Sequence, residues 1–202
     1  TGVQTCALPI SHVLANETAG RHLCQAMLLP KQESIELLRK FLKAGTIDLG
    51  RAVLSRQGKA SILEMRNARF LNAMDDNTLP AIETATDLAI LDNETQICVL
   101  RGGVVDNPKY AGRRIFCSGI NLTHLYQGEI SFLFYFLHGM GYEHKMLRGL
   151  ALPDAPSIDD TSNGTAEKPW IAAVDAFAIG GGCQHLLVMD YVLAGKDAYM
   201  TL

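Results

Sequence analysis

The chain has few of the residues that mark a disulfide-stabilised, metal-binding or membrane-spanning protein. Its five cysteines are an odd number in 202 residues, and no CxxC pair occurs. Neither a disulfide scaffold nor a zinc site is therefore predicted, and reduced thiols in the cytoplasm are expected. No apolar run reaches the roughly 18 residues of a membrane-spanning helix, and no signal-peptide pattern is found. We expect no membrane partner and no metal.

Strong charge and the common nucleotide and hydrolase motifs are also missing. The net charge is −3, too small to favour a nucleic-acid partner. No GxxxxGK[ST], GxSxG or HExxH pattern occurs, which argues against a P-loop, a nucleophile elbow and a zincin site. The triple glycine at 180–182 is not a dinucleotide fingerprint, because His185 stands where GxGxxG needs its third glycine. The six histidines lack ligand spacing, so packed or exposed roles are expected for them.

The two ends of the chain require separate treatment. Residues 1–10 read TGVQTCALPI, which is similar in every residue to the translation of a sequencing-library adapter, and no initiator Met is present. We therefore exclude residues 1–10 from fold reasoning as an artefact of sequence assembly. For the same reason we expect the chain to be a fragment, truncated at its C-terminal end and inactive by itself.

The remaining sequence predicts an α/β protein with a small helical region before it. Residues 11–57 are predicted to be the helical region; within it Ile35, Leu38 and Leu42 recur at helical spacing, and Gly45 suits the C′ position. Residues 58–202 alternate between strands (59–65, 96–101 and 169–174) and helices (from Pro80, and over 131–150). This alternation favours an α/β fold. A polar linker is expected over 151–167.

Two glycine-containing turns are the strongest functional signal in the residues themselves. FCSGIN (116–121) and IGGGCQ (179–184) each follow an apolar strand and lead into a helix. Such a unit presents unpaired backbone N–H groups at a helix N-terminus. Two units facing each other could hold one oxyanion between two donors. The alternative is that both are packing turns with no ligand.

At these turns the sequence resembles the crotonase (enoyl-CoA hydratase/isomerase) superfamily. The likeness is carried by residues 168–195 and 116–122, with residues 67–79 resembling the family's coenzyme A segment. It implies a ββα spiral, an acyl-CoA thioester substrate and a homo-oligomer, a trimer or hexamer. It also implies that the N–H groups of Ile120 and Gly181 hold the thioester enolate. The residues implied to contact the substrate or its coenzyme A are Arg69, Tyr110, Ser118, Gly119, Asn121, Gly180 and Gly182.

A narrower resemblance concerns Gln184, which stands where hydratases place a catalytic glutamate. Residues 69–73, 107–132 and the GGGCQ segment look like the 3,5-dihydroxyphenylacetyl-CoA 1,2-dioxygenase group. That likeness implies O2 as co-substrate, no metal or organic cofactor, and an orienting role for Gln184 toward the substrate or a peroxy intermediate. Two positions depart from the group: Met74 replaces an acidic residue, and His138-Gly139 replaces an arginine.

Three functions remain open on the sequence. The first is cofactor-independent oxygenation of an arylacetyl-CoA. The second is an enoyl-CoA hydratase, isomerase or thioester hydrolase of unknown substrate. The third is a non-catalytic acyl-CoA-binding relative, which the residues at 74 and 184 leave possible.

Overall fold

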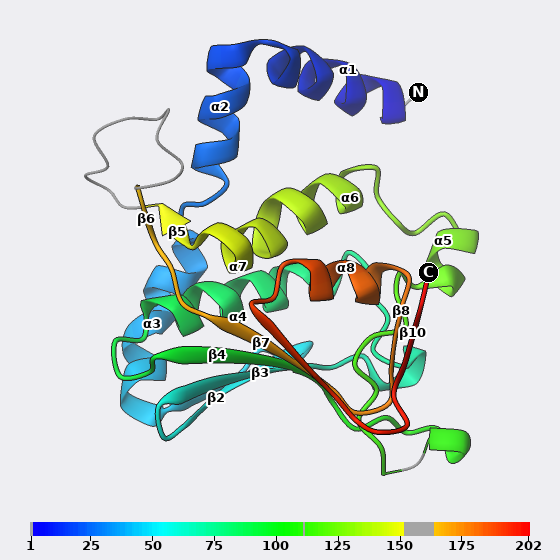
Figure 1. Ribbon diagram of the computed structural model, residues 1–202. Helices are drawn as coiled ribbons and strands as arrows, with labels where there is room; N and C mark the ends of the chain where they lie inside the picture. The colour runs from blue at the N-terminus through cyan, green and yellow to red at the C-terminus, as the bar shows by residue number, and fades with distance from the viewer. Residues whose placement is uncertain (1, 111, 152–163) are drawn as a thin grey trace.

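The computed structural model describes residues 2–110, 112–151 and 164–202 and shows a mixed sheet covered by helices (Figure 1). The first three strands of the sheet pair antiparallel, and the rest continue in parallel. In sheet order they are β1 (Thr46–Asp48), β2 (Ala52–Gln57), β3 (Ala60–Met65), β4 (Ile97–Gly102), β7 (Trp170–Val174) and β9 (Tyr191–Ala194). The predicted α/β class is confirmed.

Two smaller sheets complete the strands. β8 (Phe177–Ile179) pairs in parallel with β10 (Tyr199–Thr201), and β5 (Leu150–Ala151) pairs antiparallel with β6 (Thr165–Ala166). In Figure 1, β8 and β10 rise from one end of the large sheet toward the helical layer. This arrangement brings the end of β8 to the start of helix α8 (Gly181–Leu187).

The helices gather on one face of the large sheet: α4 (Leu79–Leu91) and α8 lie next to it, and α6 (Leu133–Leu137) and α7 (His144–Arg148) lie over them (Figure 1). The core fills the space between them and includes the fully buried Leu63, Leu100 and Trp170. No helix in the described ranges is long and apolar enough to cross a membrane. The other helices of the described residues are α1 (Gly2–Ala15), α2 (Glu17–Ala26), α3 (Gln32–Ala44), η1 (Ala68–Phe70), η2 (Pro108–Tyr110), α5 (Leu122–Tyr126) and η3 (His138–Glu143).

The predicted helical region over 11–57 is correct for α1 to α3 and wrong for residues 46–57. Those residues form β1 and β2, which join the large sheet through β3. β2 buries Ala52 and Leu54 on one face, a period of two that its polar second half disguises in the sequence. In α3, Ser34 and Phe41 are fully buried, whereas Ile35 and Leu42 are 46% and 38% exposed. The buried face of α3 is therefore rotated away from the face that the spacing of Ile35, Leu38 and Leu42 predicted.

Two segments singled out in the sequence lie partly outside the described residues. Helix α1 runs through the segment read as an adapter, but Thr1 and the side chains of residues 1–7 lie outside the described part. In the rest of α1, Leu8 and Leu14 are exposed. The artificial origin of residues 1–10 stays a prediction. The linker predicted over 151–167 falls largely in 152–163, outside the described residues.

The helix predicted over 131–150 is broken in the middle. α6 passes into the π-helical η3, and Gly141 has non-helical angles (φ −85°, ψ −115°) before α7 begins. π-Turns of this kind change the direction of the side chains that follow them. The break lets His138, Tyr142 and Glu143 all turn inward, where each is buried.

Candidate active site

The structure brings the two glycine turns into direct contact. The residues before them form a parallel bridge between Cys117 and Ala178. A β-carbon at Gly119 would lie 2.8 Å from the carbonyl oxygen of Ile179, and one at Gly182 would lie 2.6 Å from that of Cys117. Gly119 also has φ +86°, which side chains strongly disfavour. The close packing of the two turns therefore depends on glycine at both places.

The backbone N–H groups of Ile120 and Gly181 have no acceptor among the described residues. Met74 donates to Gly119 O (2.8 Å) and accepts from Asn121 N (2.7 Å), so the N–H of the intervening Ile120 points away from Met74. Gly181 is the first residue of α8, where an N–H has no partner inside the helix. No hydrogen bond from either N–H exists within the described residues. The pair is available to a ligand.

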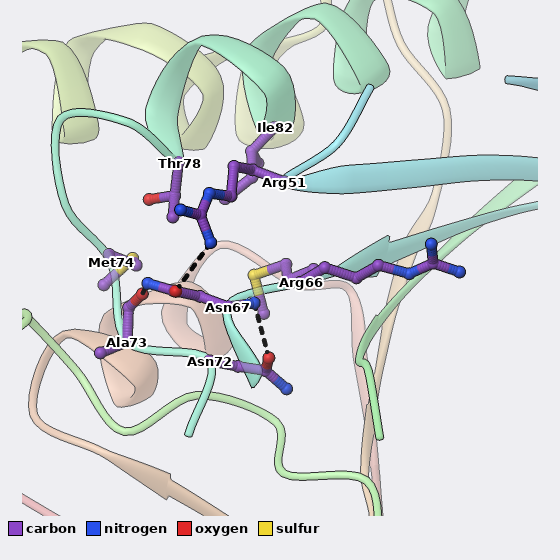
Figure 2. A pocket seen from close by; sticks show the side chains of 9 residues that line it. Arg51, Arg66, Asn67, Asn72, Ala73, Met74, Thr78 and Ile82 are labelled. Carbon is purple, nitrogen blue, oxygen red and sulfur yellow. Dashed lines mark hydrogen bonds between the residues drawn. The ribbon is translucent and has the colours of Figure 1, made fainter. Parts of the chain in front are cut away.

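Two asparagines brace the loop of residues 67–75, which lies beside the first turn (Figure 2). Asn72, at φ +56°, donates through Nδ2 to Gly103 O (2.8 Å) and Ile115 O (2.7 Å), and its Oδ1 accepts from Asn67 N (2.8 Å). Arg51 donates to Asn67 Oδ1 at 3.1 Å. These bonds fix residues 67–75 against the end of β4 and the segment that leads to the first turn.

Asp75 ties this loop to the helix after the turn. It is 2% exposed, and its Oδ2 accepts from Asn67 Nδ2 (3.2 Å) and Asn121 Nδ2 (3.0 Å) and lies 3.2 Å from His124 Nδ1. Its neighbour Met74 takes the position against the second turn, with its methyl group 2.7 Å from where a β-carbon of Gly181 would lie. The Asp75 carboxylate therefore braces the loop, and the thioether of Met74 faces Gly181 in the second turn.

The other predicted site residues lie in the two turns or at the starts of the helices that follow them. Asn121 is 1% exposed and caps α5, and Ser118 Oγ donates to Phe70 O at 3.0 Å. Gln184 is exposed on α8, with Oε1 3.5 Å from a β-carbon position at Gly181. Gly180, at φ +52°, forms the bend into α8.

Two residues predicted to contact coenzyme A, Tyr110 and Arg69, pack against aromatic rings of the protein. Tyr110 packs edge-to-face on Phe177, with ring centroids 5.4 Å apart, in a second apolar cluster. Arg69 is exposed, and its guanidinium lies 5.2 Å from the centre of the Phe70 ring. Their assignment to coenzyme A therefore stays a prediction.

A buried polar cluster lies under the start of α8, and sequence reasoning missed it. His185 is fully buried; its Nδ1 is 2.9 Å from Gly181 O and its Nε2 is 2.9 Å from the Tyr142 hydroxyl. The same hydroxyl lies 3.1 Å from Met74 Sδ. A hydroxyl has one proton, so it donates to one of these two acceptors at a time. The cluster joins η3, α8 and Met74 directly behind the two turns.

Glu143 and His138 form the deeper half of this cluster. Glu143 Oε1 lies 3.3 Å from His138 Nε2 and 3.5 Å from His185 Nδ1. Burial raises the pKa of Glu143 to about 8. Burial lowers the pKa of His138 to about 3, helped by the nearby His185, and lowers that of His185 to about 4. All three are therefore neutral near pH 7.

These three side chains are also the one group with metal-ligand geometry in the described ranges. However, both nitrogens of His185 already contact Gly181 O and Tyr142. His138 Nε2 and Glu143 Oε1 are buried without a hydrogen-bond partner among the described residues, so His185 would have to give up one of its contacts to complete the three protein ligands of a catalytic zinc site. The arrangement fits a proton-sharing cluster better than a metal centre.

The fold and paired turns define a class of protein, and comparison with known proteins identifies it. No family model matches the chain. Among solved structures it is similar to an enoyl-CoA hydratase/isomerase from Xanthobacter autotrophicus (TM-score 0.56, 18% identity, 76% of this chain and 49% of that one). A carnitinyl-CoA dehydratase from Mycobacterium avium gives TM-score 0.53 at 25% identity, covering 74% of this chain and 49% of that one. The chain therefore has the crotonase fold.

Curated relatives narrow the assignment within that fold. A (3,5-dihydroxyphenyl)acetyl-CoA 1,2-dioxygenase from Amycolatopsis orientalis is 43% identical over 191 residues, covering 94% of this chain and 43% of that protein. A short-chain-enoyl-CoA hydratase from Clostridium acetobutylicum is 26% identical, covering 75% of this chain and 49% of that protein. The chain belongs to the crotonase superfamily. It spans half or less of the length of these two relatives.

Proposed function

We propose that this protein binds an acyl-CoA thioester and stabilises its enolate between the N–H groups of Ile120 and Gly181. The observation that carries the proposal is that these two donors lack an acceptor in the part of the chain that the structure describes and stand on turns in direct contact. A carbonyl oxygen gains negative charge when its α-carbon loses a proton. Fixed donors favour that charged form without having to reorganise.

The finer proposal is oxygenation of an arylacetyl-CoA, such as 3,5-dihydroxyphenylacetyl-CoA, with O2 and without metal or organic cofactor. It is supported by the 43% identity to the dioxygenase and by an amide at Gln184, where hydratases need a carboxylate. An electron-rich aryl group would spread the carbanion charge, and the carbanion would react with O2 directly. The apolar Met74 beside Gly181 suits an aryl group.

We also propose a cytoplasmic location and a homo-oligomeric state. The free, buried thiols of Cys98 and Cys117 are consistent with the cytoplasm. The family resemblance supports a homo-oligomer, a trimer or hexamer. Size-exclusion chromatography with light scattering measures that state directly.

The first prediction is oxygen uptake by the protein in the longest form that its gene encodes. We expect stoichiometric O2 consumption with 3,5-dihydroxyphenylacetyl-CoA or a similar arylacetyl-CoA, unchanged by a chelator. An oxygen electrode and mass spectrometry of the product measure this. Hydration of a crotonyl thioester, without O2 uptake from any arylacetyl-CoA, would instead establish the hydratase alternative.

The second prediction concerns Gln184. Gln184→Glu is expected to lower oxygenation by at least about tenfold, because a carboxylate adds negative charge beside the enolate and removes an amide donor. Gln184→Asn, which keeps the amide on a shorter side chain, is the matched control and should retain more activity. Equal activity of the glutamate variant and the wild type would remove Gln184 from the mechanism.

A further inference from the structure

We propose that Glu143 is a positioning residue that works in its protonated form. Its carboxyl O–H donates to His138 Nε2, and the neutral acid lies 3.5 Å from the His185 nitrogen that holds the first turn of α8, which keeps negative charge away from the enolate. This inference rests on the proposed function, because the turn that it positions carries the Gly181 donor.

The contact between Glu143 and His138 requires a proton on one of the two facing atoms. Glu143 Oε1 and His138 Nε2 are both buried, 3.3 Å apart, and neither has a hydrogen-bond partner in the described chain. If Glu143 were ionised, His138 could donate to it from its Nε2–H tautomer, but the carboxylate charge would remain buried with no cation in contact among the described residues. A proton shared by the pair converts this contact into a hydrogen bond. Burial favours the neutral acid with the neutral imidazole over an ion pair.

His185 connects this pair to the proposed oxyanion donors. A carbonyl oxygen can only accept, so the 2.9 Å contact with Gly181 O places a proton on His185 Nδ1. That N–H also faces Glu143 Oε1 at 3.5 Å. His185 Nε2 is then an acceptor, and the Tyr142 hydroxyl donates a hydrogen bond to it at 2.9 Å. The peptide that follows the Gly181 donor is thus anchored to η3 through one imidazole ring.

No cation among the described residues balances an ionised Glu143. The titratable groups around it are neutral near pH 7: burial raises the pKa of Tyr142 well above its usual value and raises the pKa of Cys117 to about 12. The two histidines are neutral as well. Lys145, two residues further on, is engaged by Glu83 and Asp87 of α4.

Ionisation of Glu143 should therefore impair enolate formation. The new charge would be separated from Gly181 by a single imidazole ring, in surroundings with little water to screen it. Since the pKa of Glu143 is about 8, the protonated form prevails below that pH and is lost above it. Activity is expected to fall as the pH rises through this value.

The test compares Glu143→Gln with Glu143→Met. Gln keeps a neutral donor and acceptor, so we expect near wild-type turnover at pH 7 and no loss of activity between pH 7 and pH 9. Met keeps the length but removes the hydrogen bonds, and we expect about tenfold lower turnover, in line with the loss of one or two neutral hydrogen bonds. Turnover is followed as exchange of the α-hydrogens of an arylacetyl-CoA for deuterium, which reports the enolate itself. Thermal melts confirm that both variants fold.

A spectroscopic measurement tests the protonation without substrate. The infrared difference spectrum of the wild type should contain a protonated carboxylic-acid C=O band that disappears above pH 8 and is missing in Glu143→Gln. Absence of this band, or a Gln variant as impaired as the Met variant, overturns the proposal. So does one equivalent of zinc or iron in the purified protein that is lost in His138→Ala. If the band is present but no acyl-CoA undergoes exchange, the protonated cluster stands and the proposed function fails.

Discussion

Replacing Gly119 by alanine is expected to lower turnover by about 10²–10³-fold, the loss typical of removing one oxyanion donor. The β-carbon would lie 2.8 Å from Ile179 O and 3.4 Å from Gly181 N, so the two turns would have to move apart. The left-handed φ of +86° adds strain of its own. Oxygen uptake or α-hydrogen exchange measures the effect, and circular dichroism establishes that the variant is folded.

A matched control separates the contact from the strain. Gly128 has a similar φ of +73°, but no atom lies within 4 Å of its β-carbon position. Gly128→Ala should cost about 1 kcal/mol of folding stability and leave turnover unchanged. If the alanine variant at Gly119 were as active as the one at Gly128, then Ile120 and Gly181 would not act as a pair, and the enolate proposal would lose its main support.

The two turns could be predicted because their chemistry is local. A strand, a glycine and a helix start are adjacent in the sequence, so the free N–H groups follow from helix geometry. What spacing could not show is that the turns touch. That follows from the bridge between Cys117 and Ala178, which joins segments about 60 residues apart. The family resemblance supplied this information; the composition did not.

The cluster behind the turns lay beyond sequence reasoning for two physical reasons. His185 seemed an unremarkable helical histidine, and its partners come from η3, about 40 residues earlier. The inward turn of Glu143 depends on the break at Gly141, whereas an apolar, aromatic segment predicts a regular helix. The sequence comparison identified Met74 as a difference from the dioxygenase group, and the structure places the Met74 methyl group against Gly181.

The segment that carries the cluster is held on α4 by a buried charge network. Lys145 is 1% exposed, and its Nζ lies 2.8 Å from Glu83 Oε1 and 2.9 Å from Asp87 Oδ1. Asp87 is fully buried and also accepts from Ser34 Oγ and Lys31 N, both at 2.7 Å. Burial raises the pKa of Asp87, and the Lys145 charge opposes that shift. The network joins α3, α4 and α7 at one point.

Lys145→Met is therefore expected to destabilise the fold by about 3–5 kcal/mol, because it leaves the Asp87 carboxylate buried without its cation. Lys43→Met, at an exposed position on α3, is the control and should change stability by less than about 0.5 kcal/mol.

Since the folded-state pKa of Asp87 is already raised, its protonation at low pH removes the uncompensated charge. The stability deficit of the Lys145→Met variant should therefore shrink as the pH falls toward 4, and adding Asp87→Asn to that variant should recover part of the loss at pH 7. Urea unfolding at the two pH values measures both effects. A deficit that is the same at pH 4 and pH 7, and that Asp87→Asn does not reduce, would show that Lys145 acts through packing of its side chain and not through its charge.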